Sequence, residues 1–239
     1  MKSAQTKSKK TKPAHPKAAF SFRHNVLPPL MGILMFAATL GLLNWQWIEA
    51  QVQYYVLPTK TVTVKPVSML SLDPNAPAEL IIPSLGIDVP FITDQPSYDP
   101  ELVEQALRDG IVHYGTTAMP GQVGNVVALG HSSGALWTAG HYKYAFTLLN
   151  KIQDKALVYI DYKGARYIYR VTSTEVVLPN NVGVLQPTKT PQLTMITCTP
   201  VGVSSHRLVV HATQISPAPE KATAPTGKAK PVTSVSLPQ

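Results

Sequence analysis

The chain has 239 residues, enough for one globular domain with flanking segments or for two small domains. Its formal net charge is +8, yet residues 76–215 carry nine Lys and Arg against ten Asp and Glu, so the excess positive charge lies in the termini. A basic nucleic-acid-binding face on the folded part is therefore not expected, and the single cysteine, Cys198, excludes an intrachain disulfide.

A basic segment followed by an uncharged apolar segment opens the chain. Residues 1–25 contain six lysines and one arginine but no acidic residue, and residues 26–48 contain no charged side chain. The second segment has about the length that a helix needs to cross a bilayer core, so it predicts one transmembrane helix. Because basic residues favour the cytoplasmic side, residues 1–25 are expected to be cytoplasmic and the chain after Gln51 extracytoplasmic. A cleaved signal peptide is disfavoured, because Ile-Glu-Ala at residues 48–50 is a poor cleavage site.

Two segments without a sustained hydrophobic period flank the predicted domain. Residues 49–77 mix Thr, Lys, Val and Pro, which is typical of an extended stalk. Residues 216–239 lack the aliphatic side chains needed to bury a core, and this segment is predicted to be a disordered tail. The folded domain is therefore expected over residues 78–215.

The predicted domain is mostly strand-like. Short runs of β-branched and aromatic residues predict strands at residues 79–83, 87–92, 125–130, 156–162, 165–177, 192–198 and 206–215. Lys163 and Gly164 predict a tight hairpin turn, because glycine adopts a positive φ without strain. Apolar residues at helical spacing predict a helix at residues 100–110, and a second short helix is expected at residues 144–149. Many short strands with few helices favour an all-β barrel or sandwich.

Three polar side chains stand where predicted strands begin or end. His131 directly follows the strand at 125–130, Cys198 ends the strand at 192–198, and Arg207 lies nine residues further along. A cysteine attacks as its thiolate, so a nucleophilic cysteine needs a basic or cationic neighbour. Strand ends can aim side chains from a rigid scaffold into one shared mouth. The pattern indicates a cysteine nucleophile site, although a lone cysteine is more often a buried core residue.

Several segments around these residues resemble the sortase family. TMITCTP at residues 194–200, followed by HRLVV at 206–210, is similar to the family signature TLxTC and its arginine-bearing strand. Upstream, IIPSLGIDVPFI resembles the opening strand pair and VVALGHSS the histidine segment of the family. The resemblance covers residues 79–215 and keeps the family order of His, Cys and Arg. Met195 replaces the usual Leu with a side chain of similar volume.

The resemblance implies a fold, a reaction and a set of residues. It implies a closed, sortase-type β-barrel of about eight strands with a few short helices, following one transmembrane helix. Cys198 would attack a threonine carbonyl in an LPxTG-like sorting signal and form a thioester. His131 would act as acid and then base, Arg207 would hold the substrate and the oxyanion, and Thr197 is a weaker candidate for positioning substrate. The reaction needs no metal or organic cofactor; some relatives use calcium, whose site the sequence does not place.

The subclass and the acceptor remain open. TCTPVGVSSHR at residues 197–207 is similar to pilus-building sortases, yet Asp73 and Pro74 precede Asn75, where the lid motif of those enzymes has an aromatic residue. The C-terminus also has no second apolar span. The acceptor would be an amine of a cell-wall cross-bridge, a pilin lysine or, in hydrolysis, water.

Competing interpretations exist for other residues and for the whole domain. His206 adjoins Arg207, but neighbours in a strand face opposite sides, so His206 is expected to face away from the site. The other histidines, which match no catalytic position of the family, are His15, His24, His113, His141 and His211. No spacing of Cys198 with histidines indicates a zinc site. The rival function is a catalytically inactive, sortase-like surface binding module; retention of Cys, His and Arg together argues against it.

Overall fold

The computed structural model describes residues 26–43, 45, 48, 52, 72–133, 142, 144–201 and 203–224, without the side chains of residues 95–97. The predicted basic tail, most of the stalk and the end of the C-terminal tail lie outside the described residues. The chain divides into two compact units, Met1–Leu43 and Asn44–Gln239.

The first unit contains one apolar helix, α2 (Leu27–Leu43), of 17 residues. Its first turn contains Pro28 and Pro29, which suit this position because the first N–H groups of a helix have no intrahelical acceptor. Its side chains are largely exposed, including Met35 and Phe36. Within the described part of the chain, no helix reaches the length and apolar content required to cross a membrane. The predicted span at residues 26–48 extends beyond α2 into residues that are only partly described.

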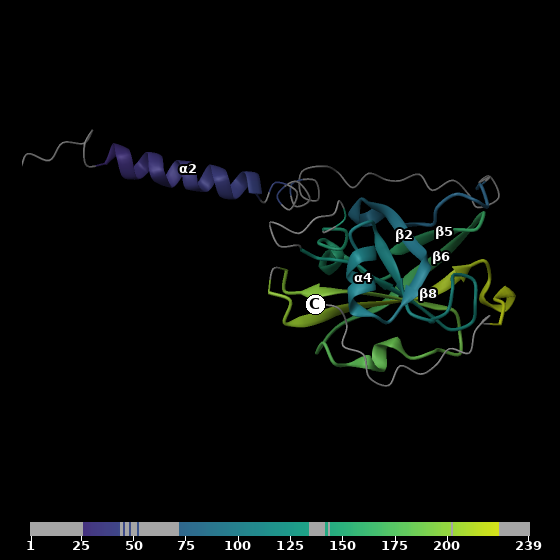
Figure 1. The fold of residues 1–239 in the computed structure, drawn as a ribbon. Helices are drawn as coiled ribbons and strands as arrows, with labels where there is room; N and C mark the ends of the chain where they lie inside the picture. Colours follow the sequence, from purple (N-terminus) through teal and green to yellow (C-terminus); the bar gives the residue numbers. More distant parts are fainter. Residues whose placement is uncertain are drawn as a thin grey trace, which may run out of the picture. The chain divides into compact units, whose positions relative to one another are not determined.

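The second unit is a closed β-barrel of eight strands (Figure 1). The strands are β1 (Glu79–Ile82), β2 (Ile87–Ser97), β3 (Ile111–Tyr114), β4 (Asn125–Leu129), β5 (Leu157–Tyr162), β6 (Ala165–Val177), β7 (Gln192–Thr199) and β8 (His206–Ser216). Around the barrel they follow the order β1, β2, β3, β4, β7, β8, β6, β5, with β5 closing on β1. The pairs β2–β3 and β4–β7 are parallel and the others antiparallel. The predicted all-β barrel is confirmed.

The wall formed by β4, β7 and β8 is buried on both faces. Alternate residues such as Leu193 and Met195 of β7 lie in the core cluster inside the barrel. Their neighbours, such as Ile196 of β7 and Val209 of β8, lie in a second cluster on the outer face. Burial on both faces explains why these strands are nearly continuous apolar runs in the sequence.

Two short elements cover the outer face of this wall. They are α4 (Pro100–Ala106) and the 3₁₀ helix η4 (Val182–Leu185), whose buried side chains join the outer cluster. The Asp99 side chain caps α4 by accepting hydrogen bonds from the backbone N–H groups of Glu101 and Leu102, at 2.9 and 3.4 Å. The cap fixes where α4 begins. It thereby also fixes the positions of Glu104 within the helix and of Leu107 at its C-terminal end.

Four other features refine the predicted elements. The strand β3 was missed, and the predicted helix at residues 144–149 is wrong: turns lead there into a 3₁₀ helix, Leu149–Lys151. The predicted hairpin is confirmed, since Lys163 and Gly164 have φ of 48° and 78°. Two further 3₁₀ helices are Pro83–Leu85 and Pro219–Lys221.

The described residues continue beyond the predicted end of the domain at residue 215. After β8 ends at Ser216, the backbone N–H of Thr223 donates to the carbonyl of Gly121 at 3.0 Å. The Thr223 carbonyl accepts from the N–H of Val123 at 2.9 Å. The first residues of the predicted disordered tail are therefore bound to the segment that precedes β4.

One histidine is built into the interior. His113 of β3 is 1% exposed, and its Nε2 lies 3.0 Å from the carbonyl of Ala118 and 3.0 Å from the hydroxyl of Thr117. Burial lowers the pKa of His113, because the charged imidazolium would lose its hydration. The folded chain therefore keeps His113 neutral at pH values where the unfolded chain, with a pKa of 6.5, takes up a proton.

His113→Gln is expected to make stability less sensitive to acid. Above pH 6.5 His113 is mostly neutral in both the folded and the unfolded wild type. The free energy of unfolding therefore loses nothing through this residue there. As the pH falls below 6.5, the unfolded state is favoured by up to about 1.4 kcal/mol per pH unit through this group. Urea unfolding of both proteins from pH 7.5 to 5 measures the difference. Equal slopes of unfolding free energy against pH would contradict the prediction.

Candidate active site

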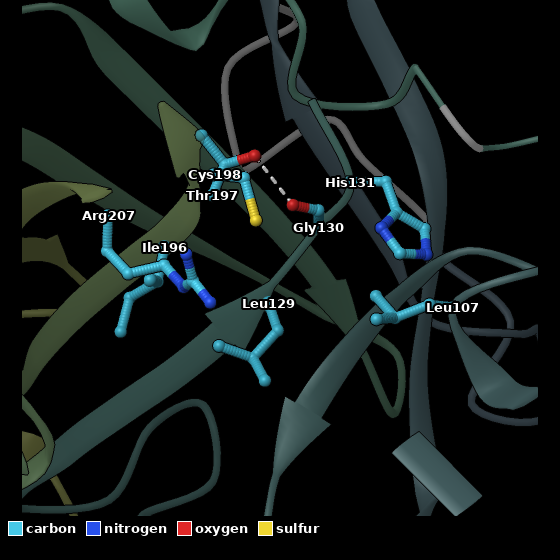
Figure 2. A pocket seen from close by; sticks show the side chains of 8 residues that line it. All are labelled: Leu107, Leu129, Gly130, His131, Ile196, Thr197, Cys198 and Arg207. Atoms are coloured by element: carbon cyan, nitrogen blue, oxygen red, sulfur yellow. Dashed lines mark hydrogen bonds between the residues drawn. The ribbon is translucent and has the colours of Figure 1, made fainter. Parts of the chain in front are cut away.

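One pocket lies where β4 and β7 end and β8 begins (Figure 2). Because β4 and β7 are parallel, with Leu129 paired to Ile196, both strands end at the same edge. The antiparallel strand β8 starts there. The pocket is lined by Leu107, Leu129, Gly130, His131, Ile196, Thr197, Cys198 and Arg207. All four residues predicted for the site thus line one pocket.

Cys198 and Arg207 face the same side of the wall. They are partners in the register between β7 and β8, and directly opposite residues of an antiparallel pair share a face. Cys198 is a free, partly exposed cysteine. Figure 2 shows its sulfur pointing into the pocket, with the Arg207 guanidinium on the same side of the pocket.

Arg207 is a buried cation. Its side chain is 1% exposed, and Nη1 donates to the carbonyl oxygens of Ser204 and His206, each at 3.1 Å. Burying a guanidinium is costly unless hydrogen bonds compensate for its lost hydration. The Ser204 carbonyl belongs to the segment between β7 and β8 and the His206 carbonyl to the first residue of β8, so both hold the guanidinium beside Cys198.

His131 occupies the other side of the pocket. It lies two residues after the end of β4, its side chain is 12% exposed, and its backbone carbonyl accepts from the N–H of Phe146 at 2.8 Å. Its Nε2 lies 3.4 Å from Oε1 of Glu104 on α4. Figure 2 shows the imidazole across the pocket from the Cys198 sulfur. The arrangement places a thiol, an imidazole and a guanidinium around one opening.

Thr197 ties the cysteine strand to the histidine segment. Its side chain is 4% exposed and its hydroxyl donates to the carbonyl of Gly130 at 2.7 Å, the bond drawn in Figure 2. The N–H of Gly130 in turn donates to the carbonyl of Ile196 at 3.1 Å. The hydroxyl proposed from the sequence to contact substrate therefore already has a partner, and this bond fixes the spacing between Cys198 and His131.

Thr197→Val is expected to lower the free energy of unfolding by about 1–3 kcal/mol, because the Gly130 carbonyl loses its donor in a buried place. Thr197→Ser is the matched control, since serine keeps the hydroxyl and loses only a methyl group. Urea unfolding at pH 7 compares the three proteins. A valine variant as stable as the serine variant would show that the hydrogen bond contributes little.

Gly130 is a site residue that the sequence analysis missed. A Cβ atom at this position would lie 2.4 Å from Cδ2 of Phe146, whose ring is completely buried. Because Gly130 has no side chain, the Phe146 ring can pack directly against it, next to His131. The sequence shows an apolar run that ends in Gly130 and His131. It does not show that Phe146, sixteen residues after Gly130, packs against this glycine.

The other described histidines lie away from the pocket. His206 is exposed, with Nδ1 3.0 Å from the Ser205 hydroxyl, as predicted for a residue that faces away from Arg207. His211 lies between the Thr194 hydroxyl, at 3.2 Å, and the Glu175 carboxylate, at 3.0 Å. His15, His24 and His141 lie outside the described residues.

His211 belongs to a polar chain that links four elements. Thr194 donates to the Asn125 side-chain oxygen at 2.7 Å, and the Asn125 amide donates to the carbonyls of Val184 and Gln186 at 3.0 and 3.3 Å. This chain holds η4 against β4 and β7. Among the residues that the structure describes, no group of three His, Cys, Asp or Glu side chains is arranged to hold a metal ion.

Comparison with known proteins gives one family match and several similar structures. The family model of the sortase domain matches residues 80–215. Sortase A from Corynebacterium diphtheriae is 30% identical, over 58% of this chain and 60% of that chain, with a TM-score of 0.48. Sortase C1 from Streptococcus agalactiae is 27% identical, over 58% of this chain and 66% of that chain, with a TM-score of 0.48. Sortase C-1 from Actinomyces oris is 27% identical, over 71% of this chain and 84% of that chain, with a TM-score of 0.47.

This chain spans less than two thirds of the length of the first two of these structures. No curated protein sequence matches the chain.

Proposed function

The chain belongs to the sortase family, and we propose on this premise that it is a membrane-anchored cysteine transpeptidase acting on LPxTG-like sorting signals. The observation that carries the proposal is the single pocket that contains Cys198, His131 and Arg207. Each of these residues comes from a different strand or strand end, and the family signature falls on the same residues.

The first half of the proposed reaction forms a thioester. The Cys198 thiolate attacks the carbonyl carbon of the signal's threonine, and a carbon–sulfur bond forms. The bond between that carbon and the following nitrogen then breaks. His131, as imidazolium, gives its proton to the departing amine, so the C-terminal fragment leaves as a neutral amine.

The second half transfers the acyl group. An acceptor amine attacks the thioester, the carbon–sulfur bond breaks, and His131 removes the proton of the attacking nitrogen. Arg207 stabilises the oxyanion of both tetrahedral intermediates with hydrogen bonds and positive charge. Its buried, doubly hydrogen-bonded side chain supports this role, since a fixed donor needs little reorganisation when the charge develops.

Attachment to the cell membrane belongs to the same proposal. The support is the uncharged segment at residues 26–48, which contains α2, and the basic segment at residues 1–25 before it. The catalytic barrel would then face the exterior, where proteins with sorting signals and acceptor amines are presented. The acceptor would be a cell-wall cross-bridge or a pilin lysine.

Mass spectrometry of the intact protein tests the proposed function. The full-length chain is incubated with a small library of LPxTG-like peptides, with and without triglycine or a lysine peptide as acceptor. We expect a mass increase equal to the acyl fragment without acceptor, and a ligated peptide with acceptor. Peptide binding without any adduct, cleavage or ligation would instead support the alternative, a catalytically inactive surface binding module.

A further inference from the structure

We infer that Glu104 is a positioning residue for His131, so that the site works as a carboxylate–imidazole–thiol arrangement with Arg207 beside it. The inference rests on the proposed function, because it assigns Glu104 a role in the same reaction. It starts from one contact, the 3.4 Å between Oε1 of Glu104 and Nε2 of His131.

The helix α4 holds the Glu104 carboxylate in a fixed place. The helix is capped by Asp99, and its Val103 and Ala106 are buried against the outer face of the barrel wall. Leu107, one turn after Glu104, lines the catalytic pocket itself. Residues three apart lie on neighbouring positions of a helix surface, so docking of Leu107 brings Glu104 to the edge of the pocket.

The contact involves a ring nitrogen that needs a partner. Nε2 of His131 is buried and forms no hydrogen bond within the described residues, whereas the Glu104 carboxylate is 37% exposed. A distance of 3.4 Å is slightly longer than an N–H···O bond, and such bonds in a site often tighten only when substrate is present. A shift of a few tenths of an ångström would close a charge-assisted hydrogen bond.

A carboxylate at Nε2 determines what the other nitrogen can do. It keeps a proton on Nε2, so neutral His131 presents the lone pair of Nδ1 to the acceptor amine. It also stabilises the imidazolium that protonates the leaving amine. Figure 2 shows one ring nitrogen of His131 turned toward the Cys198 side of the pocket, as this assignment requires.

The negative charge of Glu104 offsets the positive charge of Arg207 near His131. The groups that face His131 across the pocket are the Cys198 thiol from β7 and the Arg207 guanidinium from β8. The guanidinium disfavours an additional positive charge on His131, and the Glu104 carboxylate from α4 opposes that effect.

Steady-state kinetics with one LPxTG-like peptide test the charge of Glu104. Glu104→Gln removes the charge and keeps the shape, and Glu101→Gln on the exposed first turn of α4 is the matched control. We expect Glu104→Gln to lower kcat 10- to 100-fold, by analogy with other carboxylate–histidine pairs, with KM changed less than twofold. An unchanged kcat, or a loss confined to KM, would overturn the inference.

Nitrogen NMR of ¹⁵N-histidine-labelled full-length protein tests the position separately from activity. Wild-type neutral His131 should carry its proton on Nε2 alone, whereas Glu104→Ala should give a mixture of both tautomers. His131→Gln assigns the resonance. The same tautomer in both proteins would overturn the inference even if the peptides are ligated. A tautomer change in a protein that ligates no peptide would support the positioning while the proposed function fails.

Discussion

Cys198→Ala is expected to abolish thioester formation and all cleavage of LPxTG-like peptides, because alanine supplies no nucleophile. The fold should be retained. Cys198 is partly exposed and lies at the end of β7, so shortening it creates no large cavity. The free energy of unfolding should change by about 0.5 kcal/mol or less. Intact-mass spectra after incubation with peptide measure the adduct, and urea unfolding measures the stability.

Cys198→Ser is the control that separates the nucleophile from the shape of the site. Serine places an oxygen where the wild type has sulfur, and its hydroxyl remains protonated near neutral pH. We therefore expect at most a trace of turnover. Both variants should still bind the peptide, because Arg207 and the pocket walls are intact. Peptide ligation by the alanine variant would remove Cys198 from the mechanism.

The sequence was most informative where the structure buries strands on both faces. β4, β7 and β8 were predicted almost to their ends, because their apolar runs reflect burial inside and outside the barrel. β3 was missed, since four residues hold too little pattern and its identity comes from pairing with β2 and β4. Such pairing joins segments that lie apart in the sequence, so local propensity does not reveal it.

The wrong helix at residues 144–149 has a physical reason. Phe146 and Leu149 have the i,i+3 spacing of one helix face, and both are buried with Leu148 in the interior core cluster. Here they fill the barrel from a series of turns, with the Phe146 N–H donating to the carbonyl of His131. The apolar pattern recorded burial correctly but not the backbone conformation that achieves it.

The sequence predicted which residues meet in the candidate site but not the contacts that support them. Cys198, His131 and Arg207 stand at strand ends, and the parallel pairing of β4 with β7 brings those ends together. Glu104 lies 27 residues before His131 on a helix, and nothing in its neighbourhood indicates which side chain it meets. The Thr197 hydroxyl was a weaker candidate for positioning substrate, whereas only the structure shows its bond to Gly130.

Arg207→Lys is expected to lower kcat/KM by about 10²–10³-fold while the charge is kept. A lysine presents one compact ammonium in place of a planar fork, so it cannot hold the carbonyls of Ser204 and His206 and also donate toward the substrate in fixed directions. The loss should fall mainly on the acylation step. Single-turnover kinetics with one peptide, followed by intact-mass spectra, measure that step.

Two controls distinguish a catalytic loss from a loss of structure. Arg170→Lys makes the same exchange at an exposed position of β6 and should leave the rate near that of the wild type. Alkylation of Cys198 by iodoacetamide reports whether the Arg207→Lys protein is folded with its thiol accessible, because the chain has no other cysteine. A protein that is alkylated normally yet forms its acyl-enzyme slowly places Arg207 at the oxyanion. Acylation by Arg207→Lys at the wild-type rate would show instead that the buried cation serves the fold alone.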